Sequence, residues 1–344
     1  MATLQTMYLN FKDNIALTRE CDRYKKAREK DDVIKDKVSK AFCEEGYEVH
    51  STFLQGSLAT HTGIIPIDGD YDIDRAIAIT KASSPDNPLE PKKIIKYVLE
   101  NHNFKEPKIK KPCVTADYIN EPFHIDFPTY RVDSIGHYEL AVGKEFSDQN
   151  NRSWSPSDPK GLVEWITSEK NHQAPYITLT EEEKYQFYRL VRYMKRWRDE
   201  RYSSKSERKK VYSVALTIMI KESFCPNIDD SGKADDHKAL KDTLEIMINR
   251  YFTRNSDGNY SIRVTLPVLP YNNIYQDKGE AVGKLLHPRL KNLLNALKEV
   301  DTKDTLKAQC ELLRKHFGND FPESNNEIRD KGTKAGLVGV SDGA

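Results

Sequence analysis

The stretch FLQGSLATHTGIIPIDGDYDIDRAIAI, residues 53–79, decides the fold that we expect for this chain. Alternating and β-branched residues predict strands over 48–55 and 71–80, joined by a connection that contains Gly, Pro and Asp. In the second strand Asp72 and Asp74 are two positions apart, so both side chains project from one face while Ile73 packs on the other. The sequence therefore places two carboxylates side by side on an otherwise apolar strand.

Two carboxylates at this distance repel each other unless a cation lies between them. Magnesium suits such a site, because it takes a few hard oxygen ligands and completes its shell with phosphate oxygens and water. The pair thus indicates a phosphoryl-transfer site. An EF-hand calcium loop is excluded, since neither register, starting at Asp68 or at Asp70, has Gly in the sixth place and Glu in the twelfth. A solvated acidic turn stays open as an alternative, although it does not explain why the acids continue into an Ile-rich strand.

Gln55-Gly56-Ser57 lies where the first of these strands ends. Glycine lets the backbone approach a ligand closely, and the N–H groups at a helix start attract phosphate oxygens. The Ser57 hydroxyl adds a donor for phosphate or a ligand for a metal. By itself a Gly-Ser pair after a strand is also an ordinary turn.

A third carboxylate occurs in the stretch FHIDF, residues 123–127. Period-two alternation puts the apolar residues on one face and His124 with Asp126 on the other. Taken alone, Asp126 indicates a surface residue of a strand. If this strand lies near 71–80, Asp126 completes a cluster of three acids with Asp72 and Asp74.

The rest of the chain predicts an α+β fold with strands in the first half and helices in the second. An apolar stripe through Tyr24, Ala27, Val33, Ile34, Val38 and Phe42 indicates a long helix over 17–46. Further helices are expected over 91–102, 211–225, 235–253, 281–300 and 304–317, and a hairpin is expected from strands 114–118 and 123–130. Thr180 and Glu183 form a capping box that starts a helix ending near residue 201. We therefore expect a core over 1–157 with a long N-terminal helix, a helical lobe over 158–323 and a flexible tail over 324–344, with the active site in the cleft between core and lobe.

Composition is that of a soluble globular protein, with 38% apolar and 31% charged residues. Lys plus Arg number 54 against 53 Asp plus Glu, so no bulk charge marks the whole chain as a nucleic-acid binder. The five scattered cysteines form no CxxC pair, which argues against a disulfide framework or zinc ribbon. No signal-peptide core and no membrane span is visible, and we expect a cytoplasmic protein.

Other nucleotide chemistries lack their motifs. The sequence has no GxxxxGK[ST] loop, no GxGxxG after a strand and no nucleophile elbow of a Ser-His-Asp hydrolase. Triphosphate charge still needs cations, and the helical stretch YRLVRYMKRWR, residues 188–198, offers several. A solvated basic helix face is the alternative interpretation of that stretch.

The ordered set of Gly56-Ser57, Asp72-x-Asp74 on the next strand and Asp126 on a later one resembles the polymerase-β-like nucleotidyltransferase superfamily. The combination of QGSLATHTG, YDID, FHIDFPTY and LVRYMKRWRD is similar to the CD-NTases, bacterial cyclic-oligonucleotide synthases related to animal cyclic GMP-AMP synthase. The resemblance covers roughly residues 10–320. It implies a polymerase-β-like core of mixed sheet and flanking helices, with a C-terminal helical lobe.

The resemblance also implies two magnesium ions, or manganese in their place, held by Asp72, Asp74 and Asp126. An acceptor hydroxyl would attack the α-phosphorus of a nucleoside triphosphate and expel pyrophosphate. The expected substrates are ATP and GTP, with pyrimidine triphosphates as alternatives. A linear intermediate would then turn round in the same site and be closed into a cyclic di- or trinucleotide. Catalysis would rest on positioning and charge neutralisation, without a covalent enzyme intermediate.

Further expectations follow from comparing this sequence with the family. Gln55, Gly56 and Ser57 match its phosphate-binding turn, and Lys195 matches its triphosphate lysine. Ser213 matches a serine near the same phosphates, with a helix cap as the alternative. Asp70 points the same way as Asp72 and Asp74, and we choose the latter two because the family's acids precede an apolar strand. A His-Cys-Cys zinc insertion like that of the animal enzyme is missing, so DNA sensing through one is not expected.

The family belongs to bacterial anti-phage (CBASS) operons, where the cyclic product switches on an effector. Some members are conjugated through their C-terminus, so the tail ending in Ala344 is a candidate substrate of such machinery or a disordered end without a role. Two other functions stay open. One is a tailing polymerase or an enzyme that nucleotidylates RNA or protein, and the other is an inactive nucleotide-binding scaffold.

Overall fold

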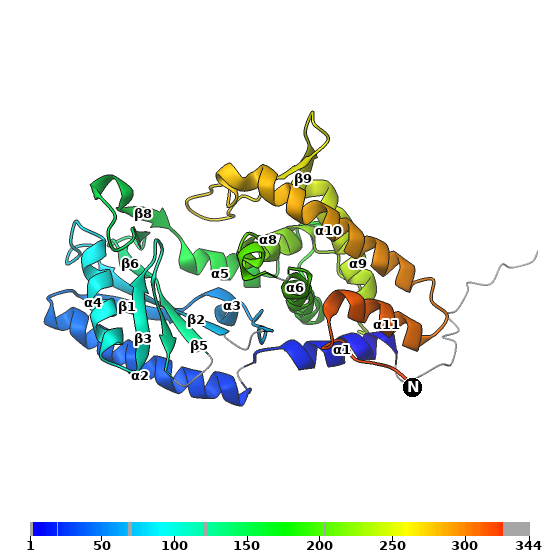
Figure 1. The fold of residues 1–344 in the computed structure, drawn as a ribbon, viewed down its shortest axis with the longest axis horizontal. Coiled ribbons are helices and arrows are strands. Elements are labelled where there is room, and N and C mark those ends of the chain that lie inside the picture. The colour runs from blue at the N-terminus through cyan, green and yellow to red at the C-terminus, as the bar shows by residue number, and fades with distance from the viewer. Residues whose placement is uncertain (1–2, 19, 68–70, 120–122, 203, 326–344) are drawn as a thin grey trace, which may run out of the picture.

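The structure is a computed structural model, and it describes all residues except 1–2, 19, 68–70, 120–122, 203 and 326–344. Figure 1 shows a part with a β-sheet beside a part built of helices. The helices are α1 Leu4–Ile15, α2 Asp22–Glu44, α3 Gly56–Ala59, α4 Leu89–Glu100, α5 Pro159–Thr167, α6 Glu181–Arg201, α7 Lys205–Arg208, α8 Ser213–Ser223, α9 Asp236–Tyr251, α10 Gly279–Val300 and α11 Leu306–Phe317, with short 3-10 turns at Gln149–Asn151 and Gln276–Lys278. The strands are β1 Val49–Leu54, β2 Tyr71–Thr80, β3 Phe104–Ile109, β4 Val114–Tyr118, β5 Phe123–Phe127, β6 Thr129–Val132, β7 Tyr138–Val142, β8 Ser153–Ser157, β9 Phe252–Arg254 and β10 Tyr260–Ile262.

Within the described residues, eight strands form one mixed sheet with β2 in the middle. β2 pairs antiparallel with β1, and on its other side it pairs parallel with β5 along its first half and with β6 along its second half. β5 and β6 keep the same register against β2 and are separated only by Pro128, which has no N–H to give to the ladder. The order along the sheet is β3-β4-β5-β2-β6-β7-β8.

One face of the sheet is covered by α2 and α4. Ile73, Ile77 and Ile79 of β2 point to this face and join a buried cluster with the apolar side chains of both helices. Of the stripe expected on α2, Val33 is the exception, because its side chain is 54% exposed. The buried position one turn before Ile34 belongs to Asp31, which is 1% exposed and pairs with Arg75 of β2.

The helical part has its own core, and α6 passes through the middle of it. Tyr193, Met194 and Trp197 of α6 are buried among side chains of α8, α9, α10 and α11. The capping box predicted for this helix is present: Glu183 N donates to Thr180 Oγ1 and Thr180 N donates to Glu183 Oε2. α6 therefore starts and ends close to the predicted residues.

The α+β class, the mixed sheet and the helical lobe are confirmed. The sequence did not predict α1, whose side chains Met7, Tyr8, Phe11 and Ile15 are buried in the helical core rather than against the sheet. The boundary at 157/158 stays a prediction, and most of the proposed tail lies outside the described residues. In the part of the chain that is described, no helix is long and apolar enough to cross a bilayer.

Candidate active site

The three predicted acids lie on adjacent strands. β2 and β5 run parallel, and Asp74 is the register partner of Asp126 while Asp72 is the partner of His124. Partners in a parallel ladder are about 4.8 Å apart and point to the same face. The structure thus brings Asp72, Asp74 and Asp126 to one face of the sheet, opposite α2 and α4. Asp70 lies outside the described residues.

The environment of Asp74 disfavours its negative charge. Burial, followed by the charges of Asp126 and then Asp72, raises the pKa of Asp74 to about 7. The Asp126 Oδ1 atom is buried and has no hydrogen-bond partner among the described residues. Buried, unpartnered carboxylate oxygens of this kind are costly, and a divalent cation would satisfy them.

Asp72 is held differently, since its side chain is exposed and contacts His124. His124 Nε2 lies 2.5 Å from Asp72 Oδ1. Burial opposes protonation of this histidine, but the hydrogen bond and charge of Asp72, with the charge of Asp126, raise the pKa of His124 above its ordinary value. When protonated, His124 would therefore partly neutralise the acids.

Gly56 brings the turn after β1 against Asp74. Its φ is +66°, and a Cβ at this position would lie 2.0 Å from Asp74 Oδ2. Gln55 N donates to Asp74 O over 3.0 Å, and the Tyr130 hydroxyl donates to Gln55 Oε1 over 3.0 Å. Ser57 follows in the first turn of α3 and is half-buried. Only glycine fits this approach, so the Gln-Gly-Ser turn and the acids form one unit.

Lys195 of α6 is buried close to this unit. Its Nζ donates to Thr62 O and to Thr62 Oγ1, each over 2.9 Å. Burial, followed by the charges of Arg198 and Arg192, lowers the pKa of Lys195 to about 7, while the charge of Asp74 acts in the opposite direction. The Lys195 ammonium is thus close enough to Asp74 for their charges to interact. Its hydrogen bonds, however, go to Thr62 in the segment that follows α3. Its contact with triphosphate stays a prediction.

Ser213 is the first residue of α8, and its Oγ accepts a hydrogen bond from Arg198 Nη1. The N-cap position of α8 is Tyr212, which makes no side-chain capping bond. The alternative that Ser213 caps the helix is therefore wrong. Its role near phosphate stays a prediction.

The chemistry of the three aspartates suits a divalent cation, but their positions in the structure do not form a complete metal site. Among the described residues no group of three or more His, Cys, Asp and Glu surrounds a point that could hold a metal. One of the three carboxylates, that of Asp72, contacts His124. Asp74 and Asp126 remain a pair of crowded, hard oxygen donors, which magnesium and manganese prefer. The chemistry of these side chains therefore suits such an ion.

Two contacts in this region were not foreseen, namely those of His124 with Asp72 and of Thr62 with Lys195. The alternation in FHIDF does place His124 on the face of Asp126, so that part of the signal was present. Thr62 lies in a connection without periodicity, and nothing in the sequence indicates that it meets α6. A cavity of about 460 Å³ opens beside the turn and is lined by Ser57, His61 and Tyr188, with side chains from both parts of the molecule.

Comparison with known proteins points to one family. Residues 51–130, which include the turn and all three acids, match the family described as cyclic GMP-AMP synthase DncV-like, nucleotidyltransferase domain. A cyclic GMP-AMP synthase of Escherichia albertii is 26% identical over 171 residues, which are 49% of this chain and 36% of that protein. The match thus spans little more than a third of the length of this curated relative.

Solved structures share the fold over nearly the whole chain. The CD-NTase CdnG of Bradyrhizobium diazoefficiens, in complex with GTP, superposes with a TM-score of 0.68 at 16% identity and covers 92% of this chain and 96% of its own. DncV of Vibrio cholerae, a cyclic AMP-GMP synthase in complex with nonhydrolyzable GTP, gives 0.63 at 18% identity, with the same coverage. CdnC of E. coli MS115-1 with ATP gives 0.60 at 14% identity, covering 92% of this chain and 98% of that one. At these identities the likeness establishes the fold.

Proposed function

We propose that the chain is a nucleotidyltransferase of the CD-NTase family, which condenses nucleoside triphosphates into a cyclic di- or trinucleotide and releases pyrophosphate. The observation that carries the proposal is the register of β2 against β5, which sets Asp74 beside Asp126. Carboxylates that can hold divalent cations beside bound phosphates are one arrangement that supports phosphoryl transfer.

Each residue of the site has a proposed task. Asp72, Asp74 and Asp126 hold magnesium, or manganese, which when bound neutralises triphosphate charge and lowers the pKa of an acceptor hydroxyl. Gly56 leaves room for the phosphates beside Asp74, because any side chain there would occupy the position of the carboxylate. Gln55 and Ser57 hold phosphate oxygens through the turn.

The helical lobe supplies the remaining contacts in this proposal. Lys195 exchanges its bonds to Thr62 for a phosphate oxygen, a change that would also restore a full charge to its ammonium. Ser213 and Arg198, which share a hydrogen bond, bind further phosphate oxygens. The acceptor hydroxyl attacks the α-phosphorus, the bond to pyrophosphate breaks, and a second round of the same reaction closes the ring.

ATP and GTP are the proposed substrates, with pyrimidine triphosphates as alternatives. The support is that related structures contain GTP in CdnG and ATP in CdnC. We further propose a cytoplasmic role in anti-phage signalling, in which the cyclic product switches on an effector. Conjugation through Ala344 belongs to the same proposal, and this residue lies outside the described part of the chain.

The test is incubation of the protein with labelled ATP, GTP, CTP and UTP in the presence of magnesium. The proposal predicts a small, phosphatase-resistant product that mass spectrometry identifies as a ring. Label found only on added RNA or on protein would support a tailing or nucleotidylating enzyme instead. Binding of triphosphate without any product would support the inactive scaffold. The matched control is the double variant Asp72→Asn, Asp74→Asn, which should make no product.

A further inference from the structure

Residues 60–67, which form the connecting segment between the glycine turn and β2, contain no helix or strand. One isolated bridge joins Ile64 of this segment to Ala16 at the end of α1. The segment matters for the candidate active site because the residues on either side of it touch. Gly56 precedes it, Asp74 follows it, and a Cβ on Gly56 would lie 2.0 Å from Asp74 Oδ2. A shift of the connecting segment would therefore change how the turn meets the acid.

Three cations of α6 bind backbone carbonyls of the connecting segment. Arg192 Nε donates to Gly63 O over 3.2 Å, Lys195 Nζ donates to Thr62 O over 2.9 Å, and Arg196 Nη2 donates to Ile65 O over 2.6 Å. Carbonyls in a segment without strand partners still need donors. The helical lobe supplies them, so α6 holds the segment at three neighbouring positions.

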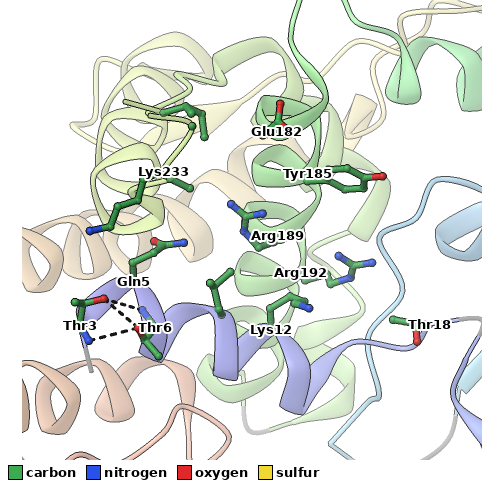
Figure 2. Close-up of a pocket in the computed structure, with 14 residues that line it drawn as sticks. Thr3, Gln5, Thr6, Lys12, Thr18, Glu182, Tyr185, Arg189, Arg192 and Lys233 are labelled. Carbon is green, nitrogen blue, oxygen red and sulfur yellow. Dashed lines mark hydrogen bonds between the residues drawn. The ribbon is translucent and has the colours of Figure 1, made fainter. Parts of the chain in front are cut away.

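The end of α1 holds the connecting segment as well. Two backbone bonds join them, from Leu17 N to Gly63 O over 3.1 Å and from Ile65 N to Ile15 O over 2.8 Å. Figure 2 shows the side chain of Arg192 on α6 extending toward Thr18, which follows α1. The connecting segment is therefore bonded to α1 and to α6 at the same time.

Arg196 is the most deeply buried of the three cations, because only 2% of it is exposed. Its Nε lies 3.1 Å from Asp320 Oδ2. Among the described residues, Asp320 is the one carboxylate that forms an ion pair with Arg192, Lys195 or Arg196. Arg196 Nη1 is buried and has no hydrogen-bond partner in the same part of the chain. Removal of the partner of a buried charge is strongly destabilising, so the place of Arg196 depends on Asp320.

Asp320 belongs to residues 318–325, the strap, which follow α11. The Asp320 carbonyl accepts a hydrogen bond from Asn14 Nδ2 of α1 over 2.8 Å. The next side chain, Phe321, is fully buried, and its ring centroid lies 5.2 Å from that of Phe11. In Figure 1 the red segment after α11 runs along α1. The strap is thus fixed to α1 and presents a carboxylate to the helix that holds the connecting segment.

We propose that Arg196 is a positioning residue of the candidate active site and that Asp320 of the strap keeps it in place. Within the described part of the chain, Arg196 bonds to Ile65 and Asp320 and not to the three aspartates. It acts through the Ile65 carbonyl on the segment that sets the glycine turn against Asp74. The effect on catalysis rests on the proposed function, whereas the link between strap and connecting segment does not.

Two carboxylates of the strap allow a matched comparison. Asp320 faces Arg196, whereas Glu323 Oε1 lies 2.9 Å from Nη2 of Arg314 on α11. The two acidic side chains are 42% and 74% exposed, so Asp320→Asn and Glu323→Gln should both fold. Each variant keeps the size of the side chain and removes one negative charge. Only Asp320→Asn removes the counter-charge of Arg196.

The first measurement is hydrogen exchange of the full chain, followed by mass spectrometry of peptides that cover residues 60–67. The amides of Thr62 and Ile65 are hydrogen-bonded, so their exchange reports opening of the connecting segment. Asp320→Asn should speed this exchange by roughly three- to tenfold, because loss of the ion pair loosens the bond from Arg196 to Ile65. Glu323→Gln should leave the exchange unchanged.

The second measurement is product formation from nucleoside triphosphates and magnesium, at a temperature well below the unfolding transition of every variant. The kcat of Asp320→Asn should fall by about tenfold, while Glu323→Gln keeps the wild-type rate. The double variant Asp320→Asn, Arg196→Met should be no slower than Arg196→Met alone, because the carboxylate acts through the guanidinium. A general loss of stability would not produce this non-additivity.

Each part of the proposal has its own contrary result. Unchanged exchange over residues 60–67 in Asp320→Asn, or equally fast exchange in Glu323→Gln, would overturn the link between strap and connecting segment. Faster exchange with an unchanged kcat would overturn the positioning role, since Arg196 would then only stabilise the fold. A wild type that forms no product would refute the proposed function and the positioning role together, and the exchange measurement would still decide whether the link exists.

Discussion

Gly56→Ala is the substitution for which the structure gives the sharpest prediction. The new Cβ would lie 2.0 Å from Oδ2 and 2.9 Å from Cγ of Asp74. An ordinary contact needs about 3.4 Å or more, so the carboxylate or the turn must move by more than roughly 1 Å. A displacement of this size in a catalytic group costs on the order of 100-fold in rate. We expect kcat for product formation to fall by about that factor.

Backbone strain adds a second, smaller effect. Alanine at a φ of +66° costs about 1–2 kcal/mol of stability, which leaves a protein of ordinary stability folded. Gly136→Ala is the matched control, since Gly136 has a φ of +87° but nothing within 4 Å of its added Cβ. Both variants should lose similar stability in urea unfolding, and only Gly56→Ala should lose activity. Equal, near-wild-type rates for the two variants would refute the close approach of this turn to Asp74.

Three further predictions concern stability and metal binding. Asp31→Ala leaves Arg75 buried without its partner and should lower the free energy of unfolding by about 3–5 kcal/mol in urea titrations. The side chain of Asp32 is 46% exposed, so Asp32→Ala should lower it by under about 1 kcal/mol. The hydrogen bond from Arg131 lowers the pKa of Glu139, so this pair stabilises the folded chain above the ordinary carboxyl pKa of 4.5 and the stabilisation is lost as pH falls through the lowered value. Wild type should accordingly lose its advantage over Glu139→Gln as the pH falls below 4.5, and an advantage that is independent of pH would contradict the ion pair. Magnesium should raise the melting temperature of the wild type and not of the variant with both β2 aspartates changed to asparagine, and an equal shift in both would place the metal elsewhere.

Much of the candidate site could be predicted because it depends on alternation along single strands. The alternation of side chains along a strand was enough to place Asp72 and Asp74 on the same face of β2, and His124 and Asp126 on the same face of β5. It could not show that β2 and β5 are neighbours, because strand pairing is a long-range property that no local pattern encodes. The family resemblance supplied that step, and the observed register agrees with it.

The features that the sequence did not predict are contacts between segments that are far apart in the chain. On α2 the periodicity assigned Val33 to the core, whereas the helix buries Asp31 and compensates its charge with Arg75. In α6 the residue pattern shows Lys195 as one of several cations, and only the family resemblance singled it out. Its bond to Thr62 follows from how the helical part packs against the segment after α3. α1 was missed because its apolar face becomes evident only beside the helices that it covers.

Asp126→Asn tests the central claim most directly, because this residue joins the site only through the pairing of β5 with β2. Asparagine keeps the size of the side chain and removes its charge. With nucleoside triphosphates and magnesium, quantified by mass spectrometry, the wild type should form a phosphatase-resistant cyclic product, and Asp126→Asn should form at least about 100-fold less while keeping its melting temperature. A folded Asp126→Asn protein that makes product at the wild-type rate would contradict the assignment of the three aspartates to one catalytic site.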